Sequence, residues 1–127
     1  TQYNTEPYFN DKKPRLEPNY SFDLCRLGCS LFDYFFDDIF DVEDEDDPIA
    51  LTIARWCLDD KERNVLYKKN GEERYPDFKL YKMIARTVHN HLPEKQLKLS
   101  YFSAFEISNN IPNNIKVMNF DILPCYA

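Results

Sequence analysis

Two cysteines and two histidines carry the most familiar metal-binding chemistry in this chain. Cys25 and Cys29 are spaced by one helical turn, and His89 and His91 follow much later. Two thiolates and two imidazoles can complete a tetrahedral zinc site. The cysteine pair, however, lies in an apolar segment, where cysteines usually act as small buried hydrophobic side chains. We therefore predict no metal site.

The His89-Asn90-His91 triplet also invites comparison with nucleases, because histidine is the commonest general acid and base. No serine or cysteine is evidently paired with either histidine, and histidines near a helix end commonly complement the helix dipole or lie at the surface. We expect both histidines to be non-catalytic.

An acidic run occupies residues 37–47, where eight of the eleven residues are Asp or Glu. Such a run can bind calcium or a basic partner, but this one lacks the loop glycine and the regular ligand spacing of an EF-hand. We expect a solvated linker, with attraction of basic substrates as the alternative.

The motifs of phosphoryl transfer are absent from the sequence. Its two glycines, Gly28 and Gly71, cannot form G-x-G-x-x-G or G-x-x-x-x-G-K-[ST], and neither His-Arg-Asp nor Asp-Phe-Gly occurs. We therefore assign no catalytic residue and no cofactor to this chain.

Composition predicts one globular domain, since 127 residues with 43% apolar content can bury a core. The net charge of -6 argues against nucleic acid as the main partner. No apolar run approaches the ~20 residues needed to cross a bilayer, so no membrane partner is expected. The four cysteines could form two disulfides, but a chain with this much apolar content does not need such cross-links, which favours a reducing, cytoplasmic setting. The opening at Thr1 without methionine suggests part of a longer protein.

The periodicity predicts a mainly α fold. Three prolines within residues 1–20 predict an extended loop. Ser21 is the expected N-cap of a helix that runs to about Phe40 and is apolar enough to be central. Asp47-Pro48 predicts the start of a second helix through about Leu58.

The second half of the chain predicts shorter elements. Asn70-Gly71 indicates a loop or a short hairpin. Pro76-Asp77 is expected to start a helix that ends before Pro93, and 94–107 to form one shorter helix. The alternation of apolar residues from Met118 predicts a strand or extended tail within 108–127. Residues expected to face the core are Phe78, Leu80, Tyr81, Ile84, Ala85, Val88, Leu92, Leu97, Tyr101, Phe102 and Phe105.

Four segments resemble parts of protein kinases. Residues 20–32, YSFDLCRLGCSLF, resemble the start of the long buried helix of the kinase C-terminal lobe, whose pattern is D-x-W-x-x-G. Asp23 and Gly28 match this pattern, and Cys25 replaces the tryptophan. The proline-containing loop before the helix resembles the end of an activation segment. RWCLDD at 55–60 and GEERYPDFKLYKMIAR at 71–86 are similar to serine/threonine kinases of large nucleocytoplasmic DNA viruses.

The resemblance covers residues 1–107 and implies a kinase C-lobe-like domain. It implies that Asp23, with Gly28, anchors the catalytic loop, and that Thr1, Thr5 and Tyr8 lie in a phosphorylation or substrate loop. ATP and Mg²⁺ would belong only to the complete enzyme, with catalytic residues upstream of Thr1.

Two functions follow as expectations. The first is a segment of a viral serine/threonine protein kinase that acts on protein substrates. The alternative is a non-catalytic structural or interaction protein, such as a minor capsid component of a virion, that keeps a kinase-like scaffold. The location implied is the host cytoplasm or the virion. The expected organisation is one domain over 1–127, with an activation-segment-like loop at 1–20, a helical core at 21–107 and an extended tail at 108–127.

Overall fold

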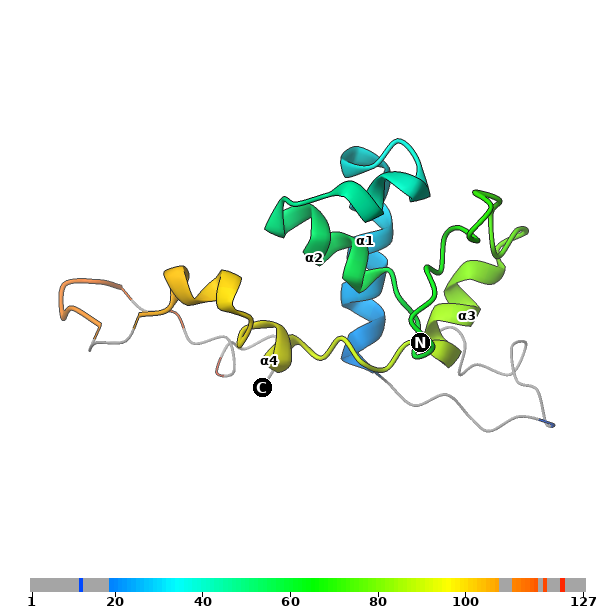
Figure 1. The fold of residues 1–127 in the computed structure, drawn as a ribbon. Coiled ribbons are helices and arrows are strands. Elements are labelled where there is room, and N and C mark those ends of the chain that lie inside the picture. Colours follow the sequence, from blue (N-terminus) through cyan, green and yellow to red (C-terminus); the bar gives the residue numbers. More distant parts are fainter. Residues whose placement is uncertain (1–11, 13–18, 108–110, 117, 119–121, 123–127) are drawn as a thin grey trace.

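The structure is a computed structural model that describes residues 12, 19–107, 111–116, 118 and 122. The described part is mainly helical, as the sequence predicts, and contains no regular strand. The helix α1 lies between α2 and α3, α4 lies near the N-terminal end of α1, and the chain after α4 runs away from the other helices (Figure 1). The elements in chain order are α1 (Tyr20–Phe35), the 3-10 helix η3 (Ile39–Asp44), α2 (Pro48–Trp56), α3 (Lys79–Thr87), α4 (Pro93–Gln96) and the 3-10 helix η4 (Ser100–Phe105).

The N-terminus of α1 is capped by Asn19, whose side-chain oxygen accepts the N–H of Ser21 at 2.9 Å. The prediction of Ser21 as the cap is wrong because its hydroxyl is needed elsewhere. Ser21 is fully buried, and its oxygen accepts the backbone N–H of His91 at 3.0 Å. A side chain predicted to act locally thus joins two distant segments.

The C-terminus of α1 lies at Phe35, before the predicted end at Phe40. Phe36 turns to an extended conformation and is buried. Asp38 then starts η3 with a capping box, in which Asp38 accepts from the backbone and the Asp41 side chain accepts the N–H of Asp38 at 2.9 Å. Aspartates compete in this way with helix continuation, which explains the early stop.

The start of α2 confirms the Asp47-Pro48 signal. The Asp47 carboxylate accepts the N–H groups of Ile49 and Ala50, and Pro48 occupies the first helical position. The helix ends at Trp56 because Leu58 leaves it to form an antiparallel bridge with Asn64.

A short irregular hairpin follows, as Asn70-Gly71 predicts. Tyr67 and Glu73 form an antiparallel bridge on either side of the turn. Gly71 has φ +85°, a conformation that favours glycine. The Arg74 guanidinium bonds the backbone oxygen of Asn64 at 2.7 Å, which ties the returning arm to the first.

The helix α3 is shorter than predicted at both ends. It begins at Lys79 instead of Pro76-Asp77, because Asp77 and Phe78 both adopt φ +60° and interrupt the helical path. It ends at Thr87, where Val88 becomes extended. Phe78 is 95% exposed, so its predicted place in the core is wrong.

Residues 94–107 form two short elements, α4 and η4, instead of one helix. Leu97 and Phe105 are exposed, contrary to prediction, whereas Tyr101 and Phe102 are half-buried with ring centroids 5.0 Å apart. The predicted strand at 118–122 falls largely outside the described residues.

The core consists of two clusters that share α1. Cys29 and Leu66 are half-buried and pack against both clusters. The first cluster is built from Phe32, Phe36, Ala50, Ala54 and Cys57, and the second from Cys25, Val65, Ile84 and Val88.

Gly28 sets the distance between α1 and α2. A Cβ atom at this position would lie 3.0 Å from Trp56 Cβ and 3.2 Å from both Cys57 Sγ and the backbone oxygen of Ile53. Two of these neighbours sit at or next to the backbone and cannot move independently. Only glycine therefore allows the two helices to approach this closely.

We predict that Gly28→Ala lowers the free energy of unfolding by about 1–3 kcal/mol, because overpacking outweighs the better helix propensity of alanine. Urea unfolding followed by circular dichroism measures the change. Ser30→Ala is the matched control on the exposed side of α1 and should stay within about 0.5 kcal/mol of the wild type. Equal stability of the two variants would contradict the tight packing.

Candidate functional site

Asp23, the residue implied to anchor a catalytic loop, lies exposed in the first turn of α1. No described residue donates a hydrogen bond to its carboxylate. Its contribution within the described part is therefore the favourable placement of negative charge at a helix N-terminus. Gly28, the second implied anchor residue, is buried on the other side of the same helix.

A second apolar stripe runs along α1 beside Asp23. Its members recur every three or four residues and so share one face of the helix. Tyr20, Leu27 and Tyr34 are exposed, and Tyr34 is 83% exposed. The described residues leave this stripe largely uncovered, although the opposite face is packed against α2. The full stripe comprises Tyr20, Leu24, Leu27, Leu31 and Tyr34.

The predicted phosphorylation or substrate loop cannot be placed next to this face. Thr1, Thr5 and Tyr8 all lie outside the described residues. Their implied role stays a prediction.

The two histidines are not placed to complete a zinc site with Cys25 and Cys29, because each has another partner. His91 is buried and directs Nε2 to the backbone oxygen of Leu58 at 2.8 Å. His89 is exposed and places Nδ1 2.6 Å from Asp60 Oδ2. Within the described ranges no group of three or more Cys, His, Asp or Glu side chains is arranged to hold a metal ion.

The cysteines instead form a cluster of thiols across α1 and the end of α2. Cys25 and Cys57 are fully buried, Cys29 is half-buried, and all three are free. Cys125 lies outside the described residues. The spacing in the sequence indicates that Cys25 and Cys29 lie one turn apart on a helix. That Cys57 lies near them follows only from the crossing of α1 and α2.

Asp59 organises the turn after α2, a role that the sequence did not reveal. Its side chain has no exposed surface and accepts the backbone N–H groups of Lys61 and Arg63 at 2.9 and 3.0 Å. The Arg63 guanidinium completes a two-point ion pair at 2.7 and 3.0 Å. Burial alone would raise the pKa of Asp59, but these donors together hold its pKa below the ordinary value.

The acidic run does not form a cation site in the structure. Several of its carboxylates accept backbone N–H groups of the run itself, as Asp38, Asp41 and Glu45 do, whereas Asp47 accepts those of Ile49 and Ala50 in α2. The rest of the run is mostly exposed. The predicted solvated linker is therefore a turn that caps its own short helix.

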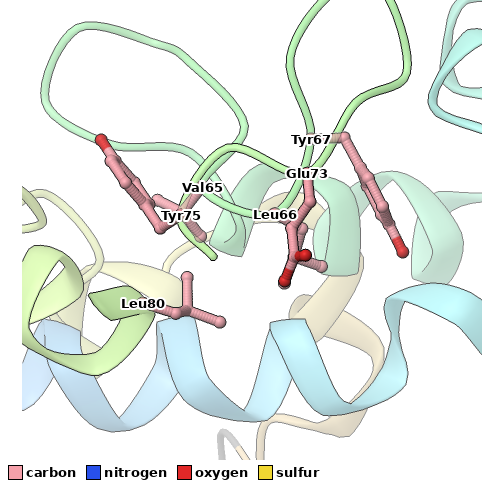
Figure 2. A pocket seen from close by; sticks show the side chains of 6 residues that line it. All are labelled: Val65, Leu66, Tyr67, Glu73, Tyr75 and Leu80. Carbon is pink, nitrogen blue, oxygen red and sulfur yellow. The ribbon is translucent and has the colours of Figure 1, made fainter. Parts of the chain in front are cut away.

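A pocket of about 220 Å³ lies between the hairpin and α3. Figure 2 shows Tyr67 and Tyr75 at its two sides, with Leu80 reaching in from α3. Among the described residues that line it, Glu73 supplies the one carboxylate, and Tyr67 and Tyr75 carry the hydroxyl groups. The volume is below that of typical sites for drug-sized ligands, and no lysine, arginine, histidine, serine or cysteine is among its described lining residues.

Asp59 gives the structure a testable pH dependence. A carboxyl group whose pKa is lowered in the folded state stabilises the protein at pH values above its ordinary pKa of about 3.9. This stabilisation is lost as the pH falls through the lower pKa of the folded state. We expect Asp59→Asn to cost about 1–3 kcal/mol at pH 7. The difference in unfolding free energy from the wild type should shrink below about pH 4.

Urea unfolding at pH 7, 5, 4 and 3 measures this difference. Asp44→Asn, an exposed position in η3, is the matched control and should cost no more than about 0.5 kcal/mol throughout. A difference between Asp59→Asn and the wild type that does not change with pH would contradict the charged pair.

None of the described helices has the length and apolar content to cross a membrane. No known family model, curated protein or solved structure matches this chain.

Proposed function

We propose that this chain is part of the C-terminal lobe of a serine/threonine protein kinase of a large DNA virus, with α1 as the central helix of that lobe. The proposal rests on the resemblance of residues 20–32, 55–60 and 71–86 to kinase sequences. It places the protein in the host cytoplasm or the virion.

The arrangement around α1 supports the proposal. Three elements from later in the chain, α2, α3 and α4, all contact α1. Both core clusters also use its side chains. A helix that organises the body in this way fits the part that the resemblance assigns to residues 20–35.

The uncovered face of α1 is the single observation that carries the proposal furthest. It combines an acidic group, Asp23, with exposed apolar side chains such as Leu27 and Tyr34. Exposure of an apolar helix face to water is unfavourable in free energy, so we expect a further protein segment to cover it. A catalytic loop held by the Asp23 carboxylate would cover it with backbone N–H donors, which a carboxylate accepts strongly.

The described residues would then act as a support and not as the chemical site. Residues outside them would hold ATP and Mg²⁺, which supply the phosphoryl group and neutralise its charge when bound. Thr1, Thr5 and Tyr8 would present or regulate the protein substrate. Asp23 is on this proposal a positioning residue.

Exposed aromatic side chains favour a second candidate function. Phe78 is 95% exposed, and two successive residues with positive φ, Asp77 and Phe78, present it at the start of α3. Exposed aromatic anchors are typical of protein interfaces. A non-catalytic interaction or minor capsid protein with the same scaffold would use such a residue to bind its neighbour.

Asp23→Ala separates these functions when it is made in two contexts. In the 127-residue chain it should cost about 0.3–1 kcal/mol, the value of a charge at a helix N-terminus. In the product of the complete reading frame it should cost about 2–4 kcal/mol, because backbone donors of the catalytic loop would lose their acceptor. Transfer of labelled phosphate from ATP to a basic protein should fall at least tenfold.

Asp37→Ala, an exposed acidic position in the 37–47 run, is the matched control and should change neither quantity appreciably. Equal effects of Asp23→Ala and Asp37→Ala in the complete protein would contradict the kinase-lobe placement. A large stability loss without any phosphate transfer by the wild type would instead favour the non-catalytic scaffold.

A further inference from the structure

Three thiols from two helices meet beside Gly28. Cys25 and Cys29 belong to α1, and Cys57 is the C-cap of α2. Cys57 Sγ lies only 3.2 Å from the Cβ position at Gly28, the residue directly before Cys29. Cys29 packs against the core cluster that contains Cys57 and also against the cluster that contains Cys25. The tight helix crossing therefore places Cys29 and Cys57 in the same packed layer between α1 and α2.

We propose that Cys29 and Cys57 are a peroxide-sensitive dithiol, in which Cys29 reacts with hydrogen peroxide and Cys57 closes a disulfide between α1 and α2. This inference does not depend on the proposed kinase function. It assigns a modification site to residues that the sequence alone presents as passive core cysteines.

Cys29 has both properties that the attacking thiol requires. It is half-buried, whereas Cys25 and Cys57 have no exposed surface, so peroxide reaches Cys29 first. The neighbouring thiols of Cys25 and Cys57, together with the nearby Arg26, lower the pKa of Cys29 below its ordinary value despite its partial burial. A lower pKa increases the fraction of Cys29 that is in the reactive thiolate form at neutral pH.

Cys57 is the resolving residue and Cys25 is not. Cβ atoms one turn apart on a helix are separated by about 5–6 Å, whereas a disulfide requires about 3.5–4.5 Å. A bond between Cys25 and Cys29 would therefore deform α1. Cys57 approaches from another helix and is not bound by this spacing. The neighbouring Cys29 thiol and burial raise the pKa of Cys57, so it stays protonated until the disulfide-forming step.

The reaction balances with one molecule of hydrogen peroxide. The Cys29 thiolate attacks one oxygen, the S–O bond forms, the O–O bond breaks, and hydroxide leaves to give a sulfenic acid. The Cys57 sulfur then attacks the Cys29 sulfur, the S–S bond forms and the S–O bond breaks. The departing hydroxide takes the Cys57 proton. Two thiols and one peroxide thus give one disulfide and two waters.

Tryptic mapping tests the proposal directly, because cleavage after Lys and Arg leaves every cysteine in its own peptide. Cys25, Cys29, Cys57 and Cys125 fall in peptides 16–26, 27–55, 56–61 and 117–127. The reduced 127-residue chain is treated with hydrogen peroxide under native conditions, alkylated with N-ethylmaleimide and digested without reductant. We expect 27–55 joined to 56–61, two hydrogen atoms lighter than their sum, and the other two peptides alkylated.

Three variants locate each role. Cys29→Ser should abolish the cross-link, and Cys25→Ser should retain it. Cys57→Ser should leave Cys29 as a sulfenic acid that dimedone traps on peptide 27–55. The oxidised wild type should unfold at a higher urea concentration than the reduced form, and dithiothreitol should restore the original midpoint.

Several results would overturn the proposal. They are a cross-link from 27–55 to 16–26 or to 117–127, complete alkylation of all four cysteines after peroxide, or a cross-linked chain whose urea midpoint does not rise. The wild-type mapping needs no variant, so poor folding of a substituted chain does not leave the proposal untested.

Discussion

The close contact between α1 and α2 at Gly28 is the constraint on which the rest of the structure depends. Because no side chain separates the helices there, Trp56 and Cys57 lie directly against α1. Trp56 then donates its indole N–H to Gln96 at 2.9 Å, which attaches α4 to the end of α2. The same contact brings Cys57 to the thiols of α1 and starts the Asp59 turn at a fixed place. One missing side chain thus sets the positions of three later segments.

Hydrogen bonds from polar groups add to this packing and join segments that are far apart in the sequence. The backbone N–H of Asp60 donates to Thr87 at 2.8 Å, and the Asp60 carboxylate accepts the N–H of His89 at 2.8 Å. His91 lies between Leu58 and Ser21, so it links the end of α2 to the start of α1. The histidines that suggest metal or nuclease chemistry in the sequence therefore have structural partners. Buried polar groups of this kind specify one arrangement of the chain.

Local signals in the sequence predicted the elements whose causes are local. Asp47-Pro48 and Asn70-Gly71 place a helix start and a turn correctly, because the cap and the positive φ depend only on nearby atoms. The boundaries at Phe35 and Lys79 could not be predicted in this way. Asp38 and Phe78 adopt conformations that periodicity does not reveal. The thiol cluster could be found only from the three-dimensional structure, because the spacing of Cys29 and Cys57 in the sequence does not indicate that they lie close together.

The two faces of α1 differ in their contacts: one face is packed in the core, and the other is left for contact with a further segment. The face of Cys25, Gly28 and Phe32 is fully used by the core. The face of Asp23 and Tyr34 has no equivalent cover among the described residues. Burial of one large apolar side chain contributes about 1.5–3 kcal/mol, so a segment that covers several of them would bind this face firmly. Under the kinase proposal that segment carries a catalytic loop, and under the scaffold proposal it belongs to a neighbouring protein.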